Sequence, residues 1–191
     1  MVEKIIFVEN NTNSASIGKD RDWHYLTVAL RDFFIAQKGE ELKDALLALG
    51  WEPANGFSSL ELEYEFNRLF TGPAPPAAPP WASVYLEKDP RLMSETTLEI
   101  KRLCRALGLS APNGVPEDWL PLELELWLTL EDYIQEDNNQ DLRKLRLWLF
   151  NHAQAWLPIF INRILLATKN SGIIYATHQL SKWLATSKER L

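Results

Sequence analysis

The residue types that most often carry catalysis or bind metals are sparse in this sequence and are not grouped in known patterns. The three histidines, His24, His152 and His178, are far apart, and each is expected to lie on a helix surface or in the core. The sequence has no Gly-rich loop ending in Lys-Ser or Lys-Thr, no His-Glu-x-x-His and no Cys-x-x-Cys. The single cysteine, Cys104, is expected to pack as a small apolar side chain. We therefore predict no catalytic residue, no metal site and no cofactor, so the protein is not expected to be an enzyme.

Aromatic side chains suited to recognition are abundant, with 8 Trp, 8 Phe and 5 Tyr. Trp81 and Tyr85 follow a proline-rich stretch, and Trp119 comes directly after Asp118. Rings beside carboxylates suit a partner with both apolar and cationic groups, because the rings provide contact area and cation–π attraction while the acids provide charge. The alternative is that these tryptophans fill a helical core.

Length and composition fit a globular protein of 191 residues, with 46% hydrophobic and 24% charged residues. Its 20 basic and 26 acidic residues give a net charge of −6, which argues against nucleic acid and favours a basic partner. No apolar run reaches the roughly 20 residues that a membrane span requires. Residues 1–8 lack the apolar core and cleavage site of a secretory leader, so we expect a cytoplasmic protein.

Apolar residues at helical spacing predict an all-α, single-domain bundle. Residues 1–19 are polar and without a period, and are expected to be a flexible arm before a domain of residues 20–191. Ser58 and Glu61 have the spacing of a capping box. The predicted helices cover residues 22–36, 41–49, 59–70, 94–107, 118–134, 141–150, 153–168 and 173–186, and Pro158 is expected to kink or break the pair 141–168.

A proline-rich connector, about residues 72–93, separates the N-terminal and C-terminal helical halves. Residues 73–80 contain five of the 11 prolines, and each proline disfavours helical geometry in the residue before it. The stretch therefore predicts a stiff, extended segment. It is either a plain linker or one lip of a binding site, since Trp81 and Tyr85 follow at once.

Residues 118–134 alternate leucine with other residues, a period of two that by itself is typical of a strand. We predict a helix, because Leu and Glu are helix formers, Asp118 suits an N-cap and Pro121 is tolerated in a first turn. This helix is expected to be the most buried one. Glu123 and Glu131 fall within its apolar arc, so each must border a groove or have a partner. The expected partner is an arginine such as Arg102, Arg105 or Arg143.

Several segments resemble the TorD/DmsD chaperones and the related nitrate reductase delta-subunit (NarJ) branch. Residues 66–73 (FNRLFTGP) and 79–86 (PPWASVYL) are similar to the E/Y-x-x-L-F-x-G-P and P-P-W/Y-x-S-V-Y/W-L segments of this family. Residues 116–125 (PEDWLPLELE) resemble its P-x-D-H and D-x-L-P-x-x-L-E segments. Residues 156–160 (WLPIF) resemble its W-L-P-x-F segment, and the resemblance covers about residues 22–186 in the family's order.

The resemblance implies an all-α cytoplasmic chaperone that binds the twin-arginine signal peptide of a molybdopterin oxidoreductase. Such a chaperone holds the apo form of the catalytic subunit back from export until its cofactors are inserted. The protein would work as a monomer or a domain-swapped dimer. The positions that match the family's peptide site are Phe66, Leu69, Pro80, Trp81, Asp118 and Trp119.

Two departures from the family pattern are visible. Trp119 replaces the histidine that follows the family's aspartate, and Phe33-Phe34 lack the usual proline after them. Our binding hypothesis adds Tyr85 to the apolar wall of the site, and has Glu117 or Glu123 help Asp118 to receive the two arginines. The alternatives are a helical assembly subunit that binds the mature part of a redox enzyme, and, with less support, a nucleotide-binding enzyme.

Overall fold

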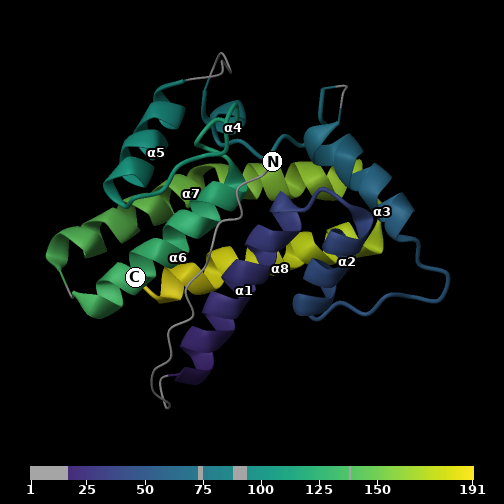
Figure 1. The fold of residues 1–191 in the computed structure, drawn as a ribbon, viewed down its shortest axis with the longest axis horizontal. Helices are drawn as coiled ribbons and strands as arrows, with labels where there is room; N and C mark the ends of the chain where they lie inside the picture. Colours follow the sequence, from purple (N-terminus) through teal and green to yellow (C-terminus); the bar gives the residue numbers. More distant parts are fainter. Residues whose placement is uncertain (1–16, 73–74, 88–93, 138) are drawn as a thin grey trace.

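The computed structural model describes residues 17–72, 75–87, 94–137 and 139–191, and within them the regular structure is helical. This confirms the predicted all-α fold (Figure 1). The helices are α1 Ile17–Ile35, α2 Gly39–Ala48, α3 Ser59–Phe66, α4 Ser83–Leu86, α5 Glu95–Ala106, α6 Leu120–Glu136, α7 Gln140–Ala167 and α8 Ser171–Glu189.

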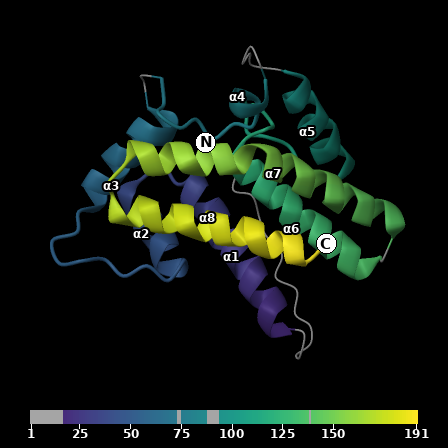
Figure 2. The same cartoon turned by 180° about the vertical axis from the view of Figure 1, so that it is seen from behind.

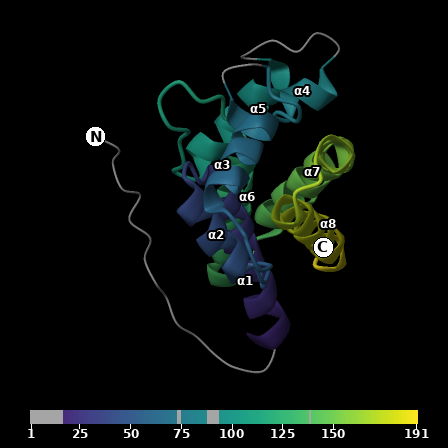
Figure 3. The same cartoon turned by 90° about the vertical axis from the view of Figure 1, so that its right-hand side faces the viewer.

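Two layers of helices make the bundle. The antiparallel pair α7 and α8 forms one layer, seen from its outer side in Figure 2 and nearly end-on in Figure 3. Helix α1 packs against α2, α6 and α8, and α6 also packs against α7. Helices α4 and α5 lie together at one edge of the molecule, with α4 against α7 (Figure 1).

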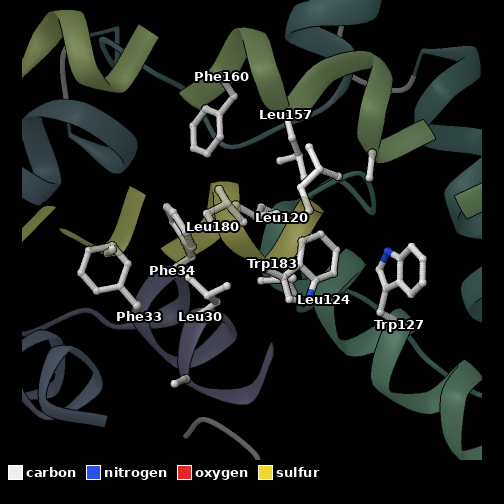
Figure 4. Close-up of a cluster of buried hydrophobic side chains, with 14 of the residues drawn as sticks. Leu30, Phe33, Phe34, Leu120, Leu124, Trp127, Leu157, Phe160, Leu180 and Trp183 are labelled. Atoms are coloured by element: carbon white, nitrogen blue, oxygen red, sulfur yellow. The ribbon is translucent and has the colours of Figure 1, made fainter. Parts of the chain in front are cut away.

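The core lies where α1, α6, α7 and α8 meet (Figure 4). Phe33 of α1, Leu124 of α6 and Phe160 of α7 are each 0% exposed. Phe34 and Phe160 place their ring centroids 5.9 Å apart, so the two layers interlock through aromatic side chains. Burial of this kind is the main stabilising term in a bundle without disulfides.

Most predicted helices are confirmed, and two boundaries are wrong. Helix α1 begins at Ile17, so residues 17–19 of the expected arm are helical, while residues 1–16 lie outside the described residues. The predicted helices 141–150 and 153–168 are one helix, α7, which continues through Pro158. Proline removes one hydrogen bond to the carbonyl four residues earlier, and both Pro158 and Gln154 are exposed, so water can bind that carbonyl.

The connector starts at an unusual helix end. Ser58 caps α3 as predicted, its hydroxyl accepting from the Glu61 N–H at 3.3 Å. The helix then widens into a π-helical turn, Asn67–Thr71, where the Gly72 N–H donates to the Asn67 carbonyl at 2.6 Å. A Cβ on Gly72 would lie 2.7 Å from that carbonyl oxygen, so the tight turn requires glycine. Residues 73–74 and 88–93 of the predicted connector lie outside the described residues.

Candidate functional site

The connector closes against the start of α6, although the two are far apart in sequence. The Ala82 N–H donates to the Asp118 carbonyl at 3.0 Å, and the Leu120 N–H donates to the Pro80 carbonyl at 2.9 Å. These bonds pair Trp81 with Trp119 as an isolated antiparallel bridge. The structure thus brings together four of the predicted site residues, which are Pro80, Trp81, Asp118 and Trp119.

Asp118 lies beneath this bridge and is 0% exposed. Its Oδ2 accepts from the Ser83 N–H at 2.8 Å, and its Oδ1 accepts from the Thr97 hydroxyl at 2.9 Å. The predicted role of Asp118 as the N-cap of α6 is wrong, because its carboxylate is turned to α4 and α5. Trp119 occupies the N-cap position and makes no side-chain cap bond.

The rings that reach the surface are half-buried. Trp81, Tyr85 and Trp119 each keep part of their side chain exposed. The Tyr85 hydroxyl donates to the Pro79 carbonyl at 2.9 Å, and its ring stacks on Trp156 with the centroids 5.7 Å apart. Burial raises the pKa of Tyr85, so the phenol stays neutral. The Arg163 guanidinium lies 5.9 Å from the centroid of the Tyr85 ring, so this ring is packed by residues of α7.

Glu123 lies one turn into α6 and is 2% exposed. One oxygen lies 2.9 Å from His152 Nε2, and the other accepts from Trp156 Nε1 at 3.2 Å. Burial opposes the charged imidazole, but the charge and hydrogen bond of Glu123, with help from Asp118 and Glu99, leave the pKa of His152 raised.

The expectation of an arginine partner is confirmed for Glu131 and wrong for Glu123, and neither glutamate pairs with Arg102, Arg105 or Arg143. Glu123 pairs with a histidine and a tryptophan, as described above. Glu131 pairs with arginines, but with Arg146 and Arg190, each at 3.2 Å. The helical wheel identified the buried carboxylates correctly, but it could not identify partners on α7 and α8.

Glu117 is the most exposed of the three predicted acidic residues. Its side chain is 13% exposed, and its Oε1 lies 2.5 Å from the Lys101 ammonium of α5. Beside this pair is an open hollow of about 360 Å³, lined by Lys101 and residues 111–117. Glu117 thus borders a surface depression and lies two residues before Trp119 in the sequence.

Phe66 and Leu69 do not reach this surface. They are 1% and 0% exposed, and Phe66 packs against Phe33 with the ring centroids 5.6 Å apart. The Leu69 carbonyl accepts from the Ala78 N–H at 2.7 Å, which ties the connector to the end of α3. A peptide lying on the surface of this structure contacts neither side chain, so their contribution is to anchor the connector.

Residues that the sequence reasoning missed are those that hold the site from behind, among them Thr97, His152 and Trp156. The four-residue spacing of His152 and Trp156 placed both on one face of α7, which was the available signal.

Cys104 is 1% exposed, and burial, with Glu123 and Glu117 nearby, raises the pKa of its thiol to about 12. The prediction that it packs as an apolar side chain is confirmed.

No group of three His, Cys, Asp or Glu side chains that could hold a metal ion occurs in the part of the chain that the structure describes. None of the helices in that part of the chain has the length and apolar character of a membrane span.

The model of the family described as nitrate reductase delta subunit matches residues 34–162. The chain belongs to this family. Among curated proteins, it is 30% identical over 110 residues to the Tat proofreading chaperone DmsD of Salmonella typhimurium, covering 55% of this chain and 52% of that protein. It is 33% identical over 108 residues to the chaperone protein TorD of Salmonella arizonae, covering 55% and 48%. The matches span about half the length of these relatives.

The fold of this chain is similar to that of a solved structure. A crystal structure from Archaeoglobus fulgidus, named as a redox enzyme maturation protein, superposes with a TM-score of 0.53 and 16% identity. The match covers 98% of this chain and 99% of that chain, so the similarity of fold extends over the whole molecule. The curated relatives are named as chaperones.

Proposed function

We propose that this protein is a cytoplasmic chaperone that binds the twin-arginine signal peptide of a molybdopterin oxidoreductase and supports cofactor insertion before export. The observation that carries this proposal is the Trp81–Trp119 bridge, a half-buried aromatic pair held by main-chain hydrogen bonds. Membership of the family and the names of its relatives DmsD and TorD support it.

The exposed residues of the site match the chemistry of such a peptide. A twin-arginine leader has two guanidinium groups followed by an apolar stretch. Trp81 and Trp119, which are partly exposed, could contact both kinds of group, since guanidinium planes stack on aromatic rings and apolar side chains pack on them. Glu117 offers a carboxylate beside the rings, at present paired with Lys101, which a peptide guanidinium would replace as the partner.

The buried members of the predicted site support these residues from within. Pro80 and Leu69 hold the connector through their carbonyls, and Phe66 anchors the helix from which it starts. Glu123 binds Trp156, on which the Tyr85 ring stacks. In this proposal the peptide touches the rings, and the carboxylates behind them keep the rings in place.

Calorimetric titration with a synthetic twin-arginine leader tests the proposal. We expect Trp81→Ala to weaken binding by about 2 kcal/mol, roughly 30-fold, because a central aromatic anchor is lost. Tyr64→Ala is the matched control, since this ring is 66% exposed on α3 and away from the site. A leader with both arginines changed to lysine should bind more weakly. Equal binding of the leader by wild type and Trp81→Ala, with both folded, would remove Trp81 from the site.

A second candidate is an assembly subunit that binds the mature part of a redox enzyme, which the description of the matching family as a delta subunit favours. A pull-down from anaerobically grown cells, followed by mass spectrometry, identifies the client. Repeating it with the client lacking its leader separates the two candidates. Capture that depends on the leader supports signal-peptide binding, and capture that survives its removal supports the assembly subunit.

A further inference from the structure

The geometry points to Asp118 as a positioning residue, whose buried carboxylate fixes the connector against the start of α6 so that Trp81 and Trp119 stand side by side. It does not receive the arginines of a bound peptide. This inference rests on the proposed function and assigns a different role to one residue of the same site.

The carboxylate of Asp118 is out of reach of a peptide bound at the surface. Asp118 is 0% exposed, and both of its oxygens already accept a hydrogen bond within the protein. Because the carboxylate is covered on all sides, a guanidinium could reach it only by opening the packing around it, including its contacts with the Ser83 N–H and the Thr97 hydroxyl. Loss of either contact would leave a buried donor without a partner, which is costly.

The carboxylate of Asp118 links the starts of three helices, α4, α5 and α6. Ser83 starts α4, Thr97 lies in the first turn of α5, and Asp118 itself precedes α6. Its own carbonyl accepts from Ala82, so side chain and main chain of one residue bind two successive connector amides. Trp81 lies directly before these amides, and its position therefore depends on Asp118.

The neighbouring carboxylate, Glu117, differs from Asp118 in its exposure and in its partner. Glu117 keeps 13% of its side chain exposed and pairs with an ammonium group that can move away into solvent. We therefore assign the salt-dependent part of peptide binding to Glu117, and the geometric part to Asp118.

Substitution of Asp118 by Asn and by Ala separates charge from geometry. An asparagine can keep both contacts, because Oδ1 accepts from the Ser83 N–H and Nδ2 donates to the Thr97 hydroxyl oxygen. In titrations with a synthetic twin-arginine leader at low and high salt, we expect Asp118→Asn to bind within about threefold of wild type with an unchanged salt slope. Asp118→Ala should bind at least about tenfold more weakly.

Two further variants complete the experiment. Thr97→Val removes one of the two bonds to the carboxylate and should weaken binding by about threefold to tenfold, again with an unchanged salt slope. It also carries the test if Asp118→Ala does not fold. Glu117→Gln is the matched charge control and should flatten the salt slope.

The positioning role is overturned if Asp118→Asn loses as much affinity as Asp118→Ala and its salt slope flattens. Amide hydrogen exchange provides a readout without peptide: exchange at Ala82, Ser83 and Leu120 should rise in Asp118→Ala and stay near wild type in Asp118→Asn. Unchanged exchange in Asp118→Ala also overturns it. If wild type binds no leader, the proposed function fails, and the exchange experiment still decides whether Asp118 holds the bridge.

Discussion

The two ends of α6 hold buried carboxylates in different ways. At the N-terminal end, Asp118 is bound by a main-chain N–H and a hydroxyl, and Glu123 by a histidine and an indole N–H. At the C-terminal end, Glu131 lies between the guanidinium groups of Arg146 and Arg190. The first end relies mainly on uncharged donors and the second on permanent charges.

This difference assigns a role to each end. Arginine stays charged at any pH the protein meets, so the Glu131 end is a fixed fastening between α6, α7 and α8. It also carries a cluster of Trp23, Trp127 and Trp183, with the Arg190 guanidinium 4.6 Å from the Trp23 ring centre. The N-terminal end has a titratable histidine and half-exposed rings, which suits a site that must respond to a ligand.

The strongest test of this contrast is Glu131→Gln, which leaves two largely buried guanidinium groups facing an uncharged amide. We expect a loss of about 3 kcal/mol in the free energy of unfolding, since breaking a buried ion pair costs about 3–5 kcal/mol. Urea unfolding measures it. Leader binding should remain unchanged by the substitution in the folded protein. A loss below about 0.5 kcal/mol would mean that Glu131 does not fasten this end.

A smaller effect is expected at the middle of the helix, where Glu125 accepts from Arg31 at 2.6 Å. Burial opposes the charge of Arg31, but its hydrogen bonds to Glu125 and Asp32 leave its pKa raised. Glu125→Gln should cost about 1.5 kcal/mol, because a hydrogen bond to a charged group is lost and both side chains keep some contact with water. Urea unfolding of both variants compares their losses in the free energy of unfolding. A larger loss for Glu125→Gln than for Glu131→Gln would contradict the stronger stabilising role of the Glu131 end.

The N-terminal end should instead show a pH dependence. Since the folded pKa of His152 is raised, its pair with Glu123 stabilises fully below the unfolded value of about 6.5, and this contribution is lost as pH rises through the folded pKa. We expect the stability difference between wild type and His152→Gln to fall as the pH rises above about 6.5. Urea unfolding below and above this pH measures it. A difference that does not change with pH would contradict the pairing.

The smallest effect is expected at the surface. Lys144 and Asp141 form an exposed pair at 2.9 Å on α7. Such pairs contribute about 0.5 kcal/mol or less, so Asp141→Asn should leave thermal unfolding nearly unchanged. A clear loss there would show that exposed charge also fastens the bundle, and would weaken the contrast between the two ends.

Local patterns predicted the helices well, and they predicted the partners of buried groups poorly. The capping serine Ser58, the helix behind the alternating leucines and the burial of Glu123 and Glu131 all depend on residues near in sequence. The partner of Glu123 lies 29 residues away on α7, and only packing of the two helices determines it.

The candidate site shows the same limit. The resemblance to a family predicted that Trp81 and Asp118 share a site. However, the sequence also predicted that the Asp118 carboxylate binds the peptide arginines and caps the helix, and the structure shows it buried. The Asp118 carboxylate instead accepts a hydrogen bond from the Ser83 N–H of α4, which is 35 residues away in sequence, so no local pattern reveals this partner. Phe66 and Leu69 lie just before the connector and are nevertheless buried, with Phe66 packed on Phe33 of α1.

The pairing of residues 80–82 with residues 118–120 has a consequence for how this chain can vary. Residues 83–117, which include α4 and α5, connect the two paired segments, and Ala82 and Asp118 bond the ends of this stretch to each other. Because the ends are already held together, added length within the stretch carries little further closure entropy. The length of this stretch can therefore change at small cost, provided that Ser83 and Thr97, which hold Asp118, and the core side chains of α5 are kept.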